Sequence, residues 1–106
     1  MAILAAALLR AEGLWSFGRS LSELSSVDRS EMADARRQLV EAMKPGSVST
    51  WKDDKTGHYG EAHLLRVYER DGMTCVDVEH IVNLPETRRY RVPLCRTDDG
   101  IWRAAY

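Results

Sequence analysis

The dipeptide Asp71-Gly72 constrains what this chain can fold into more than any other feature of its sequence. Both central residues of a two-residue hairpin turn need a positive φ angle, and Asp-Gly is among the pairs that tolerate it best. Runs of alternating polar and apolar residues, 59–68 and 73–82, lie on either side of the dipeptide. We therefore predict two antiparallel strands joined by a tight turn.

Shorter runs extend the β pattern on both sides of this hairpin, and residues typical of turns separate them. The additional strands are predicted at 47–52, 88–96 and 101–104. Within 59–68, one face is expected to carry Ala62, Leu64 and Tyr68, and the other His63, Leu65 and Val67. With helical segments before residue 46, the pattern predicts an α+β fold, in which N-terminal helices pack on a four- to five-stranded antiparallel β-meander.

The first predicted helix covers residues 2–24, where apolar side chains recur at helical spacing. Gly13 and Gly18 weaken its middle and favour a bend there. The first nine residues are apolar and uncharged, as in the central part of a signal peptide, but no Lys or Arg precedes them.

A second helix is predicted from Arg29 to Met43, with a capping box formed by Asp28 and Glu31 at its start. These boundaries divide the chain into two parts. Residues 1–27 form a helical N-terminal arm, interpreted as a targeting remnant or an oligomerisation element. Residues 28–106 form the α+β domain.

Size and charge narrow the classes of function. The chain has 106 residues, which is enough for one domain with a modest core. Its formal net charge is −1, whereas a domain that binds nucleic acid through phosphates normally has a basic excess. No run approaches the ~20 apolar residues that span a bilayer. We therefore expect neither a nucleic-acid partner nor a spanning helix.

The two cysteines, Cys75 and Cys95, can form one disulfide or remain reduced and buried. They are equidistant from Pro85, near the centre of the predicted loop 83–87. If the flanking strands pair around this loop, the two residues are directly opposed and within disulfide reach. A bridge there would contribute roughly 3 kcal/mol in the chain-entropy model. We predict the disulfide and, with it, an oxidising compartment.

An ordered set of residues resembles the C-terminal domain of the rickettsial seventeen-kilodalton common surface antigen family, found in proteobacterial envelopes. The set consists of Trp51, Gly57, Gly60, Gly72, Cys75, Cys95, Arg96, Asp99, Gly100 and Trp102. The resemblance covers 28–106 and implies a structural role for these residues, with a Cys75–Cys95 bridge and with Trp51 and Trp102 as packing anchors. It implies no catalytic activity and no established ligand. Members of the family usually carry a lipid-modified cysteine and a Gly-rich segment before this domain, neither of which is present here.

Residues that could support catalysis are few. His63 and His80 could meet across neighbouring strands, near Asp77 and Glu79, as a zinc or proton-transfer site. Their spacing is not that of a helical metal site, and surface-facing strand residues are the simpler interpretation. Cys75 as a nucleophile would need a neighbouring base. We predict no enzyme activity, no cofactor and no metal.

Two surfaces could meet a partner. One is the apolar face of the arm, which includes Leu8, Leu14, Trp15 and Phe17 and must be buried on its own sheet, on a second copy of the chain or at a membrane surface. The other is the basic pair Arg89 and Arg91, which suits an anionic partner or is neutralised across the strand by Asp77 or Glu79. A homodimer through the arm and an unknown protein partner are therefore both expected.

The sequence thus predicts a non-enzymatic structural or binding module of the bacterial envelope, periplasmic or associated with the outer membrane. An inhibitor or immunity-type protein that blocks a partner enzyme is the main alternative. It would need a rigid exposed loop, 83–87 or 53–59, that inserts into a cleft. A metal-dependent hydrolase is a third reading and requires His63, His80 and a carboxylate to converge.

Overall fold

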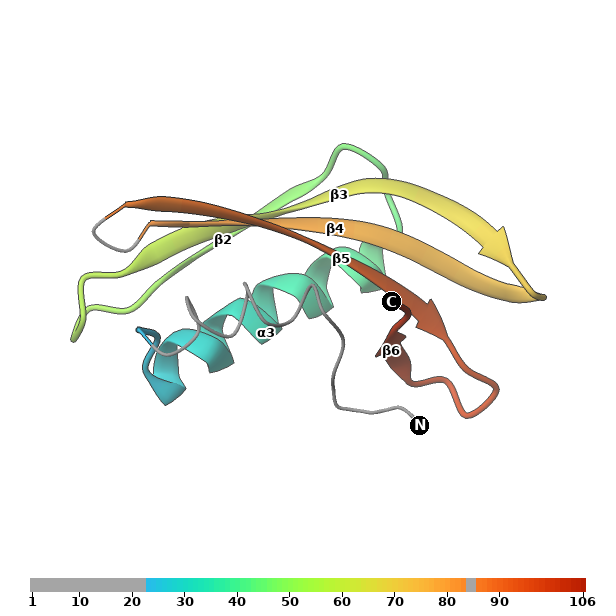
Figure 1. The fold of residues 1–106 in the computed structure, drawn as a ribbon, viewed down its shortest axis with the longest axis horizontal. Helices are drawn as coiled ribbons and strands as arrows, with labels where there is room; N and C mark the ends of the chain where they lie inside the picture. The colour runs from blue at the N-terminus through green and yellow to red at the C-terminus, as the bar shows by residue number, and fades with distance from the viewer. Residues whose placement is uncertain (1–22, 84–85) are drawn as a thin grey trace.

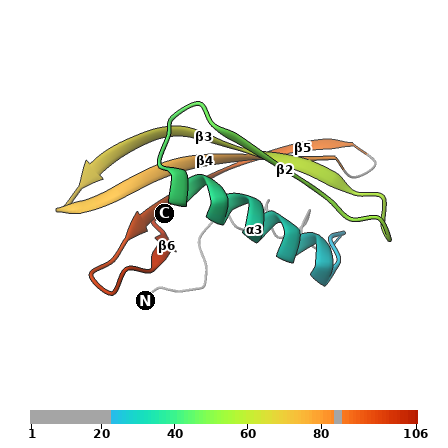
Figure 2. The ribbon, with the colours of Figure 1, turned by 180° about the vertical axis from the view of Figure 1, so that it is seen from behind.

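The computed structural model describes residues 23–83 and 86–106, and within them one helix packs on one five-stranded sheet. In chain order the elements are α3 (Ser26–Ala42), β2 (Val48–Lys52), β3 (Tyr59–Arg70), β4 (Met73–Asn83), β5 (Thr87–Arg96) and β6 (Trp102–Ala104). Every neighbouring pair of strands is antiparallel, and the strand order in the sheet follows the chain. Helix α3 crosses one face of the sheet, and β6 curls toward the same side (Figures 1 and 2).

This architecture confirms the predicted α+β class and the antiparallel meander. Residues 2–22 of the first predicted helix lie outside the described residues, as do Leu8, Leu14, Trp15 and Phe17 of the proposed partner surface. The last two residues of that prediction, 23 and 24, are described and form a turn instead of a helix.

Helix α3 begins at a different N-cap residue from the one that the sequence predicts. Ser25 is the N-cap, and its hydroxyl oxygen accepts a 2.9 Å hydrogen bond from the Asp28 amide. The Asp28 carboxylate in turn accepts from the Ser25 amide at 2.9 Å. The capping box is therefore Ser25 with Asp28, not Asp28 with Glu31, and the helix begins at Ser26 instead of Arg29. Asp28 still lies in the first turn, where a carboxylate suits the positive end of the helix dipole.

The core lies between α3 and the sheet. The helix contributes an apolar stripe with Met32, Ala35, Leu39 and Val40. The sheet contributes small aliphatic side chains from alternate positions, which are Ala62, Leu64, Val76, Val78, Val82, Val92 and Leu94. This alternation puts one face of each strand against the helix, as the period of two requires.

A bulge in β3 changes which residues face the core. The pairing with β4 shifts between Leu64 and Arg66, so that one extra residue, Leu65, is inserted. After the insertion Val67 packs against the core, while Tyr68 hydrogen-bonds to Asp77 on the outer face. The predicted grouping of Tyr68 with Leu64 is therefore wrong, because a bulge reverses the alternation that a regular strand would keep.

The hairpin turn and the disulfide agree with the predictions. Asp71 and Gly72 both have positive φ, 53° and 79°. Cys75 and Cys95 are direct partners on β4 and β5 and form a disulfide. Because Val76 faces α3, the neighbouring Cys75 faces away from it, and the bridge lies on the outer face of the sheet.

Two residues of the ordered set that runs from Trp51 to Trp102, Trp51 and Gly60, lie next to each other in the sheet. They are cross-strand partners on β2 and β3, and the Trp51 side chain is buried. A Cβ added to Gly60 would lie 2.5 Å from the Ile81 carbonyl oxygen and 2.7 Å from the Trp51 indole nitrogen. Glycine is therefore required because the indole and the neighbouring backbone occupy the space of a side chain.

Candidate functional site

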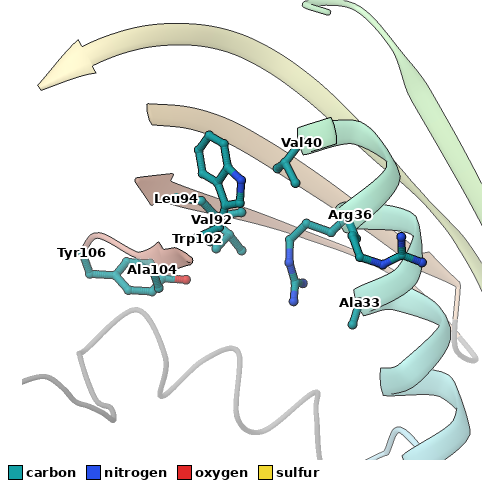
Figure 3. Close-up of a pocket in the computed structure, with 9 residues that line it drawn as sticks. Ala33, Arg36, Val40, Val92, Leu94, Trp102, Ala104 and Tyr106 are labelled. Carbon is teal, nitrogen blue, oxygen red and sulfur yellow. The ribbon is translucent and has the colours of Figure 1, made fainter. Parts of the chain in front are cut away.

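A pocket of about 410 Å³ opens between α3 and the β5–β6 edge of the sheet. Arg36 and Val40 of α3, Val92 and Leu94 of β5, and the aromatic residues Trp102 and Tyr106 are among the residues that line it. Figure 3 shows Trp102 and Tyr106 across from the helix residues. The walls are thus mainly apolar, and the charged side chains that line the pocket, Arg36 and Arg37, both come from α3.

Arg36 is the charged residue of this pocket that stands out. A guanidinium is protonated at any physiological pH even though burial lowers the pKa of Arg36. Its Nη1 lies 3.2 Å from Nε2 of His80. Within residues 23–83 and 86–106, no carboxylate forms an ion pair with it.

The neighbouring Arg37 also lines the pocket but differs from Arg36 in exposure and in its ion pairs. It is exposed, and its guanidinium reaches the carboxylates of Asp34 at 3.4 Å and of Glu41 at 3.3 Å. These ion pairs raise the pKa of Arg37, whereas burial lowers that of Arg36. Arg37 is therefore a solvated surface residue, and Arg36 is a cation held beside an apolar wall.

His80 holds Arg36 from the side of the sheet. It faces the core from β4, opposite Ala62, and is fully buried. Burial, with a smaller effect of the Arg36 charge, lowers its pKa to about 3. The ring is neutral near pH 7, so Nε2 accepts from Arg36 and the proton sits on Nδ1, which has no hydrogen-bond partner in the described structure.

Sequence reasoning missed both Arg36 and the pocket. The signal was present, because Arg36 lies four residues after Met32 and four before Val40, within the apolar stripe of the helix. An arginine at such a position must find a polar partner in the core or bring its charged end to an opening. The interpretation of His80 as surface-facing is also wrong, because its register places it opposite Ala62 on the core face.

A second polar cluster lies at the other end of α3. Asp28 is fully buried, and Nδ1 of His58 lies 2.7 Å from its Oδ2. The hydroxyl of Thr56 donates to Oδ1 at 3.0 Å. Burial alone would raise the pKa of Asp28, but hydrogen bonds from His58, the Ser25 amide and Thr56 outweigh it and hold the pKa at about 2. The carboxylate is therefore ionised and fully coordinated.

This cluster contains a serine, a histidine and an aspartate, but their contacts are not those of a nucleophilic triad. The Ser25 hydroxyl donates to Asp53 Oδ2 at 3.1 Å and accepts from the Asp28 amide. A catalytic serine instead gives its proton to the histidine. We interpret the cluster as a clamp that fixes the loop between β2 and β3 to the start of α3.

His63 and His80 do not converge, as the hydrolase reading would require. His80 faces α3, whereas His63 is paired with Glu79 on β4 and faces the other side of the sheet, with its Nε2 2.6 Å from Glu61. Among the described residues there is no group of three metal-ligating side chains. The arrangement required by the hydrolase reading is therefore contradicted.

Of the basic pair on β5, Arg89 forms an ion pair with a carboxylate of β4, which is one of the two alternatives considered for this pair. Arg89 lies 3.6 Å from Glu79, and Arg91 is the direct partner of Glu79 in the register. On the same face Arg66 forms a 2.6 Å ion pair with Asp77 and covers the ring of Tyr68. The outer face is therefore a mixed charged surface and not a basic patch.

Comparison with known proteins adds no assignment to these sites. No family model, no curated protein and no solved structure matches the chain. The described helix is neither long nor apolar enough to cross a membrane. The candidate site is therefore the pocket defined by Arg36, and its function has to be argued from its own chemistry.

Proposed function

We propose that the protein is a non-catalytic binding module of the bacterial envelope. In this proposal the pocket beside α3 receives a partner segment that presents an apolar surface and one carboxylate. Arg36 carries the proposal. Its guanidinium is a cation next to apolar side chains, and in the described structure it hydrogen-bonds to His80 but has no carboxylate partner.

The geometry of Arg36 suits such a partner. A guanidinium has five N–H donors, and His80 accepts only one of those of Arg36 in the described structure. Its hydrogen bond with a neutral ring fixes the position of the group and leaves its charge uncompensated. A carboxylate would bind in the two-pronged manner that guanidinium groups favour.

The walls select for the rest of the partner. Val92 and Leu94 supply aliphatic surface, and Trp102 and Tyr106 supply aromatic surface that favours apolar side chains over water. Burial of apolar area stabilises a complex by about 25 cal/mol per Å² before the entropic cost of association. An amphipathic segment with one acidic residue meets both requirements.

The envelope location is supported by the cystine and by the family resemblance. Disulfides are typical of proteins that fold in oxidising compartments. The ordered motif from Trp51 to Trp102 resembles a family of envelope surface antigens. The intact mass of the protein isolated from its native compartment, before and after reduction, tests this part: free thiols there would contradict it.

A fluorescent fatty acid, dansyl-labelled undecanoate, is a suitable probe of the pocket because it combines one carboxylate with an apolar body. We expect saturable binding that Arg36→Gln weakens about tenfold or more, since a hydrogen bond to a charged group contributes about 1.5–3 kcal/mol. Arg88→Gln is the matched control, since it makes the same chemical change at an ion-paired arginine outside the pocket, and it should leave the affinity unchanged. Equal affinity for Arg36→Gln and wild type, or no binding to any variant, contradicts the proposal.

One observation favours the alternative function of an enzyme inhibitor. The loop between β2 and β3 is braced by Asp28 through Thr56 and His58, and its tip residues Asp54 and Lys55 are exposed. Inhibitors often present such a pre-formed loop. If the loop is the inhibitory surface, Lys55→Glu would abolish inhibition of the partner enzyme and Arg36→Gln would not. The opposite pattern would show that the loop does not contact the enzyme.

A further inference from the structure

We propose that the partner segment binds in extended form, as a strand added to the free edge of β6, with alternate side chains in the pocket and an acidic one on Arg36. This inference rests on the proposed function of the pocket and specifies the conformation and the sequence pattern of the partner. Its additional support comes from the backbone of β6, which the proposed function does not use.

The outer edge of β6 has unpaired backbone groups. In the described structure β6 is the last strand of the sheet and has β5 as its one neighbour. The Ala105 amide and the Ile101 carbonyl both form hydrogen bonds with backbone groups of segment 93–97. Because the direction of these groups alternates along a strand, the N–H and C=O of Trp102 and Ala104 point away from β5, toward the open edge.

The same residues of β6 present their side chains to the pocket. Trp102, Ala104 and Tyr106 line it. Arg103 lies between them and is directed elsewhere, with its guanidinium 3.1 Å from the Asp99 carboxylate. An added strand that bonds to the backbone of Trp102 and Ala104 therefore places every second side chain of its own on the pocket side of the sheet.

Arg36 determines which side chains suit these inward positions. Strand β6 curls toward the α3 side of the sheet (Figures 1 and 2), and both elements line the pocket. The Arg36 guanidinium has no carboxylate partner in the described structure, so Asp or Glu at one inward position would compensate its charge. Apolar residues two positions before and after the acidic one would meet the walls formed by Val92 and Leu94.

The opposite edge of the sheet is less suitable. Strand β2 contributes none of the described residues that line the pocket. It ends in Lys52, whose exposed ammonium lies 3.4 Å from the Asp54 carboxylate. Charged side chains on an edge strand, lysine in particular, disfavour the addition of another strand. The unpaired backbone and the uncompensated charge thus coincide at β6.

Two peptides of identical composition test the pattern. Both are acetylated and amidated, and their sequences in one-letter code are TITETIT and ITTETTI. In the first, the isoleucines lie two positions from the glutamate and share its face of a strand; in the second they lie three positions away, on the opposite face of a strand but the same face of a helix. TITETIT should displace dansyl undecanoate at a concentration about tenfold lower or less, because it buries its isoleucines in the pocket.

A pair of proline variants tests which edge is used. Ala104→Pro removes an outward N–H and leaves the bonds between β5 and β6 in place, as proline requires on an edge strand. It should weaken TITETIT binding by about twofold to tenfold, which corresponds to one hydrogen bond. Thr50→Pro is the matched control on β2. Its N–H also points outward, because Ser47 and Asp53 direct their backbone groups toward β3, and it should leave the affinity unchanged.

Amide hydrogen exchange of the wild-type protein gives a second measurement that needs no variant. Saturation with TITETIT should slow exchange of the Trp102 and Ala104 amides about tenfold or more, because these amides become hydrogen-bonded. The Ala105 amide already donates to the Pro93 carbonyl and is the internal reference. Unchanged exchange at Trp102 and Ala104 would show that the peptide does not add to β6.

The remaining outcomes separate this inference from the proposed function. If Arg36→Gln weakens dansyl undecanoate binding but the two peptides compete equally or not at all, the proposed function stands and the added strand is overturned. If Arg36→Gln has no effect on that probe, the proposed function itself fails. Weaker TITETIT binding by Thr50→Pro alone would place the strand on β2. A dimer in light scattering that Ala104→Pro dissociates would identify a second copy as the occupant of this edge. Either result overturns the inference.

Discussion

Removal of the Cys75–Cys95 disulfide should destabilise the protein by about 3 kcal/mol. The bridge joins residues separated by 20 positions. In the chain-entropy model, closing a loop of this size removes about 11 cal/mol/K from the unfolded state, or about 3 kcal/mol at 25 °C. Because small domains are stable by only about 5–15 kcal/mol, the bridge contributes a large part of the total.

Urea unfolding followed by tryptophan fluorescence measures this effect, since Trp51 is buried in the native core. With a slope of about 1–2 kcal/mol/M, the midpoint of Cys75→Ala/Cys95→Ala should fall by roughly 1.5–3 M. Wild type unfolded in the presence of a reductant keeps both sulfur atoms and separates the loss of the cross-link from the loss of side-chain volume. A change below about 1 kcal/mol in the reduced protein would refute the loop-closure reasoning.

Three further predictions follow from single residues. Gly60→Ala should lower the free energy of unfolding by about 1–3 kcal/mol or more, because its Cβ would overlap the backbone oxygen of Ile81; urea unfolding within about 0.5 kcal/mol of wild type would contradict the steric argument. Asp28 has a pKa of about 2 in the folded state against an ordinary 3.8, so its stabilisation of about 2 kcal/mol is present above pH 4 and lost as the pH falls toward 2. The difference in free energy of unfolding between wild type and Asp28→Asn should therefore shrink over that window. A constant difference would show that the Asp28 carboxylate is not the group that titrates there. The pKa of His80 is lowered from 6.5 to about 3, so the contribution of the neutral ring to the free energy of unfolding is present above pH 6.5 and lost as the pH falls toward 3. Its ring resonances in NMR spectra should stay constant from about pH 8 to about pH 4. Titration near the ordinary pKa would show that the ring is not buried.

Local signals predicted the β part of the fold well. The Asp71-Gly72 turn is readable because its backbone geometry admits few residue types. The cystine is readable because strands that pair around a loop place equidistant residues opposite each other. Both depend on neighbours in sequence or on a single register, and sequence alone contains that information.

The errors have a common cause, which is that they depend on contacts between distant segments. The bulge at Leu65 and the burial of His80 both depend on how β3 and β4 pair, and no local sequence pattern predicts either feature. The capping box moved to Ser25 because that residue also hydrogen-bonds to Asp53, a partner 28 positions along the chain. Packing and long-range hydrogen bonds therefore decided between local alternatives that the sequence left nearly equal.

The sequence by itself determined the class of fold, the order of strands and the position of the disulfide, because periodicity and turn chemistry act over a few residues. Only the tertiary structure decided the candidate site. Arg36 reads as one charged helix residue among several until the sheet places neutral His80 beside it and the β5–β6 edge closes an apolar wall. A binding site is a property of surfaces brought together from α3, β5 and β6, and their juxtaposition exists only once the chain has folded.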